Sequence, residues 1–286
     1  MQTYHECIPC FLKQALNAAK LATDDTAVHE HVIRQVLREA AEMPLDQSPP
    51  VMGQRIHRII REATGSADPY EEVKAHYNRF ALSLYPRLKE TVTRSDRPLE
   101  TAIRLSIAGN IIDFGMPQSI EDAHVASVLD QSLTQDLVGD VAAFQASLEQ
   151  AENILFLGDN AGEIVFDRLL IETLPRDNIT YVVRGGPVIN DATHADARTA
   201  GLTDRVEVMD NGTDAPGTLL EQCSDTFRQR FREADLVVAK GQGNFESLSD
   251  AARHLYFIFK VKCPVVAVHT GTPAGSMIIH ERREAP

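Results

Sequence analysis

The spacing of hydrophobic residues divides the chain into two parts. Up to about Gln150, apolar residues recur every three or four positions, as on one face of an α-helix, for example at Val32, Val36 and Ala40. Clusters of proline, glycine and small polar residues interrupt this pattern at 48–50, 65–69, 95–98 and 114–117. No convincing β-strand stands out here, and we predict an all-α domain over residues 1–150.

One helix start in this part is signalled by particular residues. Asp68 followed by Pro69 is typical of an N-cap and a first helical position, and it predicts a helix from Tyr70 to about Lys89.

After Glu152 the pattern changes to short apolar runs that alternate with helical stretches. The runs are rich in β-branched residues and predict five strands, at 154–157, 179–183, 206–209, 236–239 and 265–268. Runs that are apolar on both faces are expected of strands in a parallel sheet covered by helices on both sides. The predicted helices are 163–173, 191–200, 219–233 and 245–259. We therefore predict an α/β fold, with an all-α N-terminal domain and a Rossmann-like, doubly wound, mostly parallel sheet in residues 151–286.

Glycines and polar groups follow each predicted strand. The segments that follow the strands are 158–163, 184–191, 210–214, 240–246 and 269–272. In open parallel sheets, ligands bind beyond the carboxyl ends of the strands, where loops and helix N-termini meet. Five such segments on one edge predict a functional site there.

The side chains in these segments favour metal and phosphate chemistry. Asp159, Asn160 and Asp191 are hard oxygen ligands that suit Mg²⁺, Mn²⁺ or a similar divalent cation. Lys240 could neutralise a phosphoryl oxygen, and the amides of Ala161, Gly162 and Glu163 should open a helix whose N-terminus attracts anions. A metal, a lysine and a helix N-terminus are the parts that phosphoryl transfer needs.

Each of these residues also has a simpler explanation. Asp159-Asn160 and Asn190-Asp191 could be ordinary helix caps, and Glu163 a first-turn acid that complements the helix dipole. Lys240, Arg184 and His269 could be polar residues at loop entries. The functional interpretation therefore depends on all of them coinciding at one edge.

Charge and composition narrow the possible partners. The 286 residues include 41 acidic and 28 basic ones, a formal net charge of −13 without any stripe of Lys or Arg. Such a field repels nucleic acids and anionic membranes. No apolar run is long enough to cross a bilayer and no signal peptide is visible, so we expect a cytoplasmic protein. We predict a small phosphorylated metabolite as the partner and leave the oligomeric state open.

The four cysteines do not change this interpretation. Cys7 and Cys10 form a CxxC, but His5 is the only further zinc ligand close to it in the sequence, and the motif opens a predicted helix instead of following a strand. We interpret the CxxC as mostly structural, with metal binding or a disulfide as minor alternatives. Cys223 and Cys263 are predicted to be buried, inert thiols.

Three of these segments resemble a known family. Gly158-Asp-Asn-Ala-Gly-Glu163, Arg184-Gly-Gly-Pro-Val-Ile-Asn-Asp191 and Lys240-Gly-Gln-Gly-Asn-Phe-Glu246 are similar to signature segments of the DUF89 family, the ARMT1-like damage-control phosphatases. The segments Cys7-Ile-Pro-Cys10, Asp68-Pro-Tyr-Glu-Glu-Val-Lys74 and Ala108-Gly-Asn-Ile-Ile-Asp113 resemble its small prokaryotic branch. The resemblance covers essentially the whole chain.

The resemblance implies a helical domain joined to a Rossmann-like domain, and a phosphatase that uses a divalent metal, such as Mg, Mn, Co or Ni, on sugar phosphates or damaged phosphorylated metabolites. Asp159, Asn160 and Asp191 match the metal ligands of the family, and Lys240 its phosphate-contacting lysine. Asn110 and Glu163 match further positions near that site. The expected catalytic residues are Asp159, Glu163, Asp191 and Lys240, and the expected phosphate-binding residues are Asn110, Ala161, Gly162, Arg184, Lys240 and Asn244.

Several points stay open at this stage. Asn110 and Asp113 are either a buried polar pair or the contribution of a closing helical domain to the site. The nucleophile is either a metal-activated water or Asp159, and Glu163 or Glu246 could accept the proton. An alternative function is a transferase that binds S-adenosylmethionine or a nucleotide, although the first loop lacks the GxGxxG spacing. A non-enzymatic metal-binding module based on the CxxC ranks last. The substrate and the preferred metal are not determined.

Overall fold

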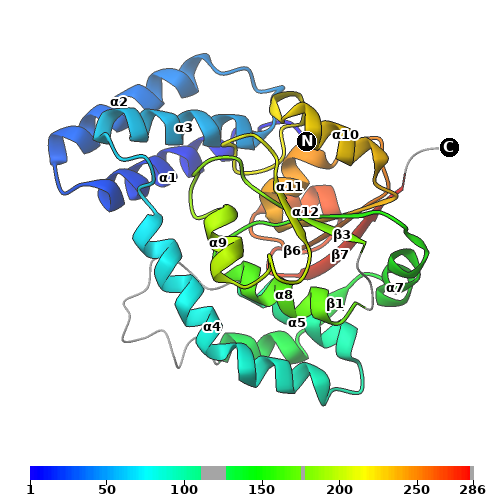
Figure 1. Cartoon of the computed structure of the whole chain (residues 1–286). Coiled ribbons are helices and arrows are strands. Elements are labelled where there is room, and N and C mark those ends of the chain that lie inside the picture. Colours follow the sequence, from blue (N-terminus) through cyan, green and yellow to red (C-terminus); the bar gives the residue numbers. More distant parts are fainter. Residues whose placement is uncertain (111–126, 175–177, 284–286) are drawn as a thin grey trace.

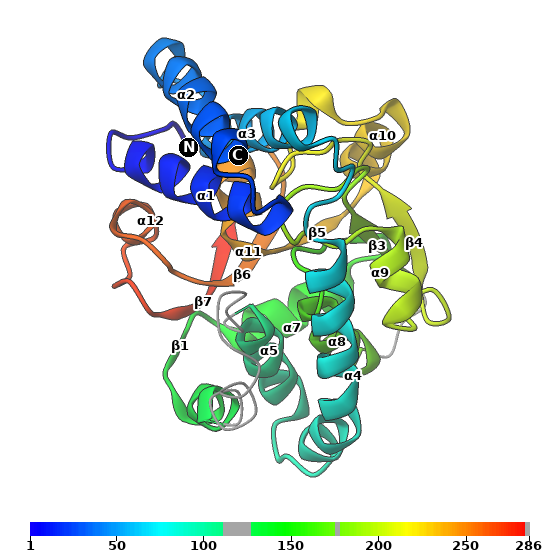
Figure 2. The same cartoon turned by 90° about the vertical axis from the view of Figure 1, so that its left-hand side faces the viewer.

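A bundle of three helices occupies one end of the molecule. The computed structural model describes residues 1–110, 127–174 and 178–283. In it, α1 (Cys7–Ala22), α2 (Thr26–Glu42) and α3 (Pro49–Thr64) pack against one another around a hydrophobic core of their own. Figures 1 and 2 show this bundle beside one edge of the sheet, and α4 (Glu71–Thr93) extends away from the bundle.

A seven-stranded sheet forms the centre, in the order β1-β7-β6-β5-β2-β3-β4. Five strands are parallel to one another: β2 (Ile154–Leu157), β3 (Ile179–Val183), β4 (Glu207–Asp210), β5 (Leu236–Lys240) and β6 (Leu255–Lys260). Strand β7 (Met277–Arg282) runs antiparallel to β6 and parallel to the short strand β1 (Leu137–Val138). All residues of β2, β3 and β5 are buried, which is why their sequences are nearly continuous apolar runs.

Helices cover both faces of the sheet. On one face, α4, α5 (Pro98–Gly109), α7 (Val141–Gln150) and α8 (Glu163–Glu172) share a core with Phe156, Tyr181 and Val238. On the other face, α10 (Asp225–Glu233), α11 (Gly241–Leu248) and α12 (Pro264–Thr270) pack on Leu155 and Phe257. The short elements α9 (His194–Thr199) and η1 (Leu220–Gln222) lie in the connections. The predicted α/β fold class is confirmed.

The last part of the sheet differs from the prediction. The predicted helix 245–259 ends at Leu248, and its second half forms the buried strand β6. The predicted strand 265–268 is instead part of α12, which has Pro264 in its first turn and leaves Val268 83% exposed. The aromatic residues of β6 favour a strand, and Pro264 signals a helix start, so these local signals outweigh the spacing of apolar residues. Strand β7 was not predicted.

The helical half also differs from the prediction in two places. The two-residue strand β1 lies before residue 150 and joins the sheet through β7. Helix α4 begins at Glu71 with Tyr70 as its N-cap, so Asp68 and Pro69 precede the helix. The Asp68 carboxylate instead accepts a hydrogen bond from the Tyr70 amide at 3.0 Å, as in a turn that mimics a cap.

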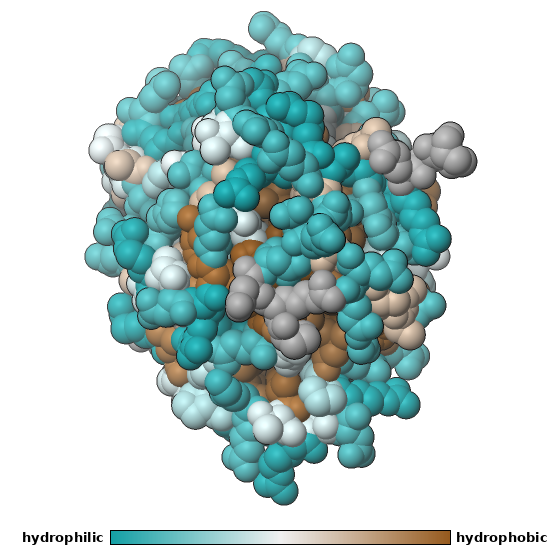
Figure 3. Space-filling view, turned by 45° about the vertical axis from the view of Figure 1, so that its right-hand side comes forward, coloured by the Kyte–Doolittle hydropathy of each residue, from teal (hydrophilic) through white to brown (hydrophobic). Residues whose placement is uncertain are grey.

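The exterior agrees with the charged composition. On the face shown in Figure 3, hydrophilic side chains cover most of the surface, and hydrophobic ones gather in its central and lower part. Within the described residues, none of the helices combines the length and the apolar character needed to cross a membrane.

Candidate active site

The candidate site lies where the winding of the sheet reverses. From β2 the chain moves outward through β3 and β4, and then returns to β5 and β6 on the other side of β2. The carboxyl ends of β2 and β5 are therefore neighbours, and Asp159 follows β2 while Gly241 follows β5. A Cβ atom on Gly241 would lie 2.0 Å from Oδ2 of Asp159, so only glycine allows this approach. Ligands bind at such switch points in doubly wound sheets.

Backbone hydrogen bonds bring Asp191 to the same place. The amide of Ala161 donates to the carbonyl of Asn190 at 2.8 Å, and the amide of Ala192 donates to the carbonyl of Asp159 at 2.8 Å. Asn160 and Asp191 consequently form an isolated antiparallel bridge. The neighbouring Ile189 has a φ of 44°, which is strained for a β-branched residue, and it packs against the core of the α1–α3 bundle.

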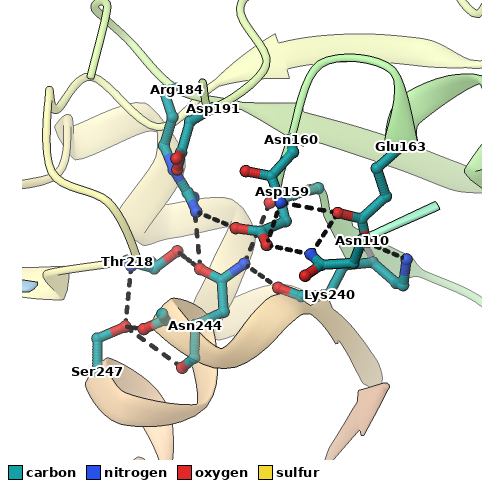
Figure 4. Close-up of polar contacts among 12 residues, drawn as sticks. Asn110, Asp159, Asn160, Glu163, Arg184, Asp191, Thr218, Lys240, Asn244 and Ser247 are labelled. Carbon is teal, nitrogen blue, oxygen red and sulfur yellow. Dashed lines mark hydrogen bonds and ion pairs between the residues drawn. The ribbon is translucent and has the colours of Figure 1, made fainter. Parts of the chain in front are cut away.

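Two asparagines hold the carboxylates of Asp159 and Glu163 together. The amide nitrogen of Asn110 donates to Oδ2 of Asp159 at 2.7 Å and to Oε2 of Glu163 at 2.5 Å. The amide nitrogen of Asn160 donates to the same two oxygens at 2.8 and 2.9 Å (Figure 4). Asn110 is the C-cap of α5, so the helical half contributes directly to the site. Asp113, which the sequence pairs with Asn110, lies outside the described residues.

The Lys240 ammonium points away from the cavity and into the protein. It donates to Oε1 of Glu163 and Oδ1 of Asp167 at 2.6 Å each and to the carbonyl of Ser106 at 3.2 Å. Although burial acts against the charged form, the carboxylates of Asp167 and Glu163 raise the pKa of Lys240. All three donors of this fully buried ammonium are used within the protein, so the predicted contact of Lys240 with a phosphate would have to replace one of these bonds.

A cavity of about 290 Å³ opens beside the three predicted metal ligands. Asp159, Asn160 and Asp191 line it together with Asn190 and Ile189. The other lining residues come from the helical bundle and from the segments after β4, β5 and β6; they are Phe11, Gln14, Pro49, Pro50, Gly53, Pro216, Gln242, Gly243, Glu246 and Lys262. The three predicted metal ligands therefore face one hollow between the bundle and the sheet edge, whereas the other side chains expected to be catalytic or phosphate-binding do not line it.

The donor set of this cavity fits a hard divalent cation. Oδ1 of Asp159, Oδ1 of Asn160 and Oδ1 of Asp191 accept no hydrogen bond from the described residues. Burial is the main cause that raises the pKa of Asp159 to about 8, and the carboxylates of Glu163 and Asp191 add to it. The cavity lining holds three carboxyl groups, those of Asp159, Asp191 and Glu246, and one lysine, Lys262, which is an excess of acidic groups. Among residues 1–110, 127–174 and 178–283, no three His, Cys, Asp or Glu are grouped so that they could hold a metal ion. The candidate set combines two carboxylates with the amide oxygen of Asn160.

Arg184 is buried between the candidate metal ligands. Its Nε donates to Oδ2 of Asp191 at 2.6 Å, and its Nη1 donates to Oδ1 of Asn244 at 3.3 Å. Nη2 lies 3.6 Å from Oδ1 of Asp159 and has no hydrogen-bond partner in the described structure. Arg184 thus orients Asp191, and this nitrogen can interact with a further anionic group.

Three other predicted phosphate-binding groups are engaged within the protein. The amide of Gly162 donates to Oδ1 of Asn78 on α4 at 2.7 Å, and the amide of Ala161 donates to Asn190. Asn244 is fully buried; it donates to the carbonyls of Gly158 and Lys240 and accepts from Thr218 at 2.8 Å. These groups fix the loops after β2 and β5, and in the described structure they have no donor left for a phosphate.

Sequence reasoning missed three residues that line or support the site, namely Lys262, Asp167 and Asn78. Lys262 follows the carboxyl end of β6, so the strand-end argument would have found it if β6 had been recognised. Asp167 lies four residues after Glu163 on α8, a spacing that places both carboxylates on one helix face. Asn78 carried no sequence signal that distinguished it from other polar residues of α4.

None of the four cysteines lines this cavity. Cys7 begins α1, as expected, and all four cysteines are free thiols in the described structure. Burial raises the pKa of the Cys7 thiol. Cys223 is buried as predicted, whereas Cys263 is only half-buried and accepts a weak contact from Nε2 of Gln242 at 3.7 Å.

Comparisons with known proteins agree with this architecture. An acid-lined cavity at the switch point of a doubly wound sheet, closed by a helical bundle, defines an α/β protein with a candidate cation site. The chain belongs to the damage-control phosphatase ARMT1-like family, whose domain it matches over residues 3–278.

Relatives share nearly the full length. A protein of Archaeoglobus fulgidus named damage-control phosphatase is 36% identical, over 95% of this chain and 96% of its own. A damage-control phosphatase of Pyrococcus horikoshii is 33% identical, over 97% of each chain. The crystal structure of a DUF89 family protein from Pyrococcus horikoshii superposes with a TM-score of 0.89 at 31% identity, covering 99% of this chain and 100% of that one.

Proposed function

We propose that this protein is a metal-dependent phosphatase that hydrolyses phosphomonoesters of small metabolites, such as sugar phosphates or damaged phosphorylated metabolites. The observation that carries the proposal is the convergence of oxygens from Asp159, Asn160 and Asp191 on one cavity that has an excess of negative charge. The phosphatase names of the relatives support the same reaction.

The three oxygen ligands would hold Mg²⁺, Mn²⁺, Co²⁺ or Ni²⁺. When bound, the cation would withdraw charge from the phosphoryl group and favour attack by water. Asn110 and Asn160 keep the carboxylates of Asp159 and Glu163 in place through four amide hydrogen bonds. Lys240 holds Glu163 from behind, and Arg184 holds Asp191. The ligand set is therefore pre-organised mainly by side chains that do not themselves bind the metal.

Lys262 is the proposed phosphate-binding cation in place of Lys240. It is exposed, it lines the cavity, and its charge acts on the carboxyl of Asp159 to lower its pKa. A flexible lysine is suited to neutralise a phosphoryl oxygen as a point charge. The backbone amide of Lys262 donates to Oε1 of Gln242 at 3.0 Å, which fixes the base of the side chain at the cavity.

The size of the cavity supports a small substrate. Its volume of about 290 Å³ lies just below the range of roughly 300–1,000 Å³ that is usual for small-molecule sites. Pro49, Pro50 and Phe11 form an apolar wall, and Gln14 on α1 faces the cavity without a hydrogen-bond partner in the described structure. This wall would contact the organic part of the phosphomonoester.

The proposal is tested by phosphate release from a panel of sugar phosphates and p-nitrophenyl phosphate. Each substrate is assayed with Mg²⁺, Mn²⁺, Co²⁺ or Ni²⁺ and after chelation. We expect turnover that requires a divalent metal and that Asp159→Ala and Asp191→Ala abolish. Asp204→Ala removes an exposed carboxylate that has no partner among the described residues, and it should leave turnover unchanged.

A thermal-shift measurement supplies an independent readout. Divalent metal should raise the unfolding temperature of the wild type and of Asp204→Ala, because it binds the folded state only, but not that of Asp191→Ala. Turnover that survives complete chelation, or that persists in Asp159→Ala, would refute the proposal.

A further inference from the structure

Helix α11 contributes a further carboxyl group, that of Glu246, to the lining of the cavity that holds the candidate metal ligands. The helix begins at Gly241, in contact with Asp159, and Glu246 lies about 7 Å further along its axis. Gln242 and Glu246 are four residues apart, so they share one helix face, and both line the cavity. The close approach of Gly241 to Asp159 places the start of this helix beside the metal ligands.

The Glu246 carboxyl is oriented by Gln242. The backbone amide of Lys262 donates to Oε1 of Gln242 at 3.0 Å, which forces the amide nitrogen of that glutamine to face Glu246. Nε2 of Gln242 then donates to Oε1 of Glu246 at 2.8 Å. Oε2 of Glu246 accepts no hydrogen bond from the described residues and is the atom left for a ligand in the cavity.

The surroundings of Glu246 favour a carboxyl group that retains its proton near neutral pH. Burial raises the pKa of Glu246 to about 7, although the hydrogen bond from Gln242, the N-terminal ammonium and Lys262 act in the opposite direction. The ammonium of Met1 donates to the carbonyl oxygen of Glu246 at 3.0 Å, and Cys7 of α1 is a further titratable group that interacts with the carboxyl. A catalytic acid is most effective when its pKa is close to the working pH.

We infer that Glu246 is the general acid that protonates the leaving-group oxygen of the phosphomonoester, an inference that rests on the proposed phosphatase function. Water attacks phosphorus while the bond between phosphorus and the ester oxygen breaks. Oε2 of Glu246 gives its proton to that oxygen, so the product leaves as an alcohol together with inorganic phosphate. The carboxylate is reprotonated from solvent, and the proton lost by the attacking water returns to solvent.

The experiment compares two leaving groups in wild type and Glu246→Gln. The nitrophenolate of p-nitrophenyl phosphate leaves without protonation, whereas the alkoxide of glycerol 2-phosphate requires it. We expect Glu246→Gln to lower kcat for glycerol 2-phosphate by about 100-fold or more and kcat for p-nitrophenyl phosphate by less than about 3-fold. The pH profile for glycerol 2-phosphate should lose its decline above about pH 7 in the variant.

Glu233→Gln is the matched control. Glu233 accepts a hydrogen bond from Gln229 at 2.8 Å with the same four-residue spacing, but on α10 and away from the cavity. The substitution Glu233→Gln should leave kcat for both substrates and the pH profile unchanged.

Equal losses on both substrates would overturn the inference, because Glu246 would then act on folding or binding alone. Unchanged turnover of glycerol 2-phosphate would overturn it as well. If the wild type hydrolyses neither substrate with any metal, the proposed phosphatase function itself is wrong, and the role of Glu246 falls with it. The two failures are therefore distinguished by the wild-type rate on p-nitrophenyl phosphate.

Discussion

The amide nitrogen of Asn110 lies 2.7 Å from Oδ2 of Asp159, so a residue at the end of α5 holds the first carboxylate after β2. The same nitrogen reaches Glu163 at the start of α8. Because α5 and α8 also pack against each other, the hydrophobic core on this face of the sheet positions the site. The helical half of the chain is thus a structural part of the candidate active site.

Replacing Asn110 should weaken metal binding. In Asn110→Ala, Asp159 and Glu163 each lose one of two amide hydrogen bonds, and we expect metal affinity and kcat/KM to fall by roughly 10–100-fold. Asn110→Asp removes the same hydrogen bonds and adds a fourth carboxylate beside Asp159, Glu163 and Asp191, so we expect it to raise the pKa of Asp159 further and to shift metal binding to higher pH. Calorimetric titration with Mn²⁺ measures the affinity.

Asn153→Ala is the control, since Asn153 is exposed at the opposite end of β2 and makes no side-chain hydrogen bond in the described structure. A metal affinity of Asn110→Ala equal to that of the control would show that the amide bonds do not organise the ligands.

The close approach of Gly241 to Asp159 makes a second prediction. Gly241→Ala should lower kcat/KM by about 100-fold, because the new Cβ, 2.0 Å from Oδ2, must displace the carboxylate. Gly271 has a similar φ of 68° but nothing within 4 Å of an added Cβ. Gly271→Ala should therefore cost only about 1 kcal/mol in unfolding free energy and no activity. Unfolding in denaturant and steady-state kinetics separate the two effects, and equal activity in both variants would contradict the prediction.

The sequence predicted the centre of the fold better than its edge. Strands β2, β3 and β5 are buried on both faces, so each is a nearly continuous apolar run that matches its predicted range within a residue. Strand β6 has the same character, but it follows α11 after a short turn, and the apolar spacing across both elements also fits one long helix. That one error concealed Lys262, because the strand that positions it was not recognised.

The candidate site was predictable where strand ends determine position. Asp159 and Asp191 follow neighbouring strands, and backbone hydrogen bonds between their segments bring them together. The direction of the Lys240 side chain was not predictable in the same way, because it depends on a tertiary contact with α8 and with the carbonyl of Ser106. Asn78 likewise reaches Gly162 only through the packing of α4 on α8.

The ionisation of Asp214 should make the unfolding free energy of the protein depend on pH in the acidic range. Burial alone would raise its pKa, but hydrogen bonds from Arg58, Arg61 and Gln54 of α3 lower it from 3.8 to about 2. After solvent screening, the folded state gains about 1–2 kcal/mol from the ionised carboxylate above about pH 4, and this gain is lost as pH falls through 2. Asp214→Asn should be less stable than wild type by that amount at pH 7, and nearly equally stable near pH 2. Denaturant unfolding at both values tests this, and a constant difference would contradict it.

The two lysines near the site should respond in opposite ways to substitution. Lys240→Met leaves the buried carboxylates of Glu163 and Asp167 without their cation, and we expect a loss of about 3–5 kcal/mol in unfolding free energy. Lys262 is exposed and its side chain has no ion pair in the described structure, so Lys262→Ala should change stability by less than about 0.5 kcal/mol.

For substrate binding the order of the two substitutions should be reversed, with the larger direct effect from Lys262→Ala. Lys262→Ala should raise KM for a phosphomonoester by about 10-fold or more, because a point charge on the phosphoryl group is lost, and Lys262→Arg should recover part of it. Lys20→Ala, which removes an exposed lysine of α1, is the control for net charge. The opposite outcome would contradict this assignment. If Lys240→Met folds as stably as wild type but binds phosphate weakly, and Lys262→Ala binds phosphate normally, then Lys240 makes the phosphate contact. The ion pairs of Lys240 with α8 would then be of secondary importance.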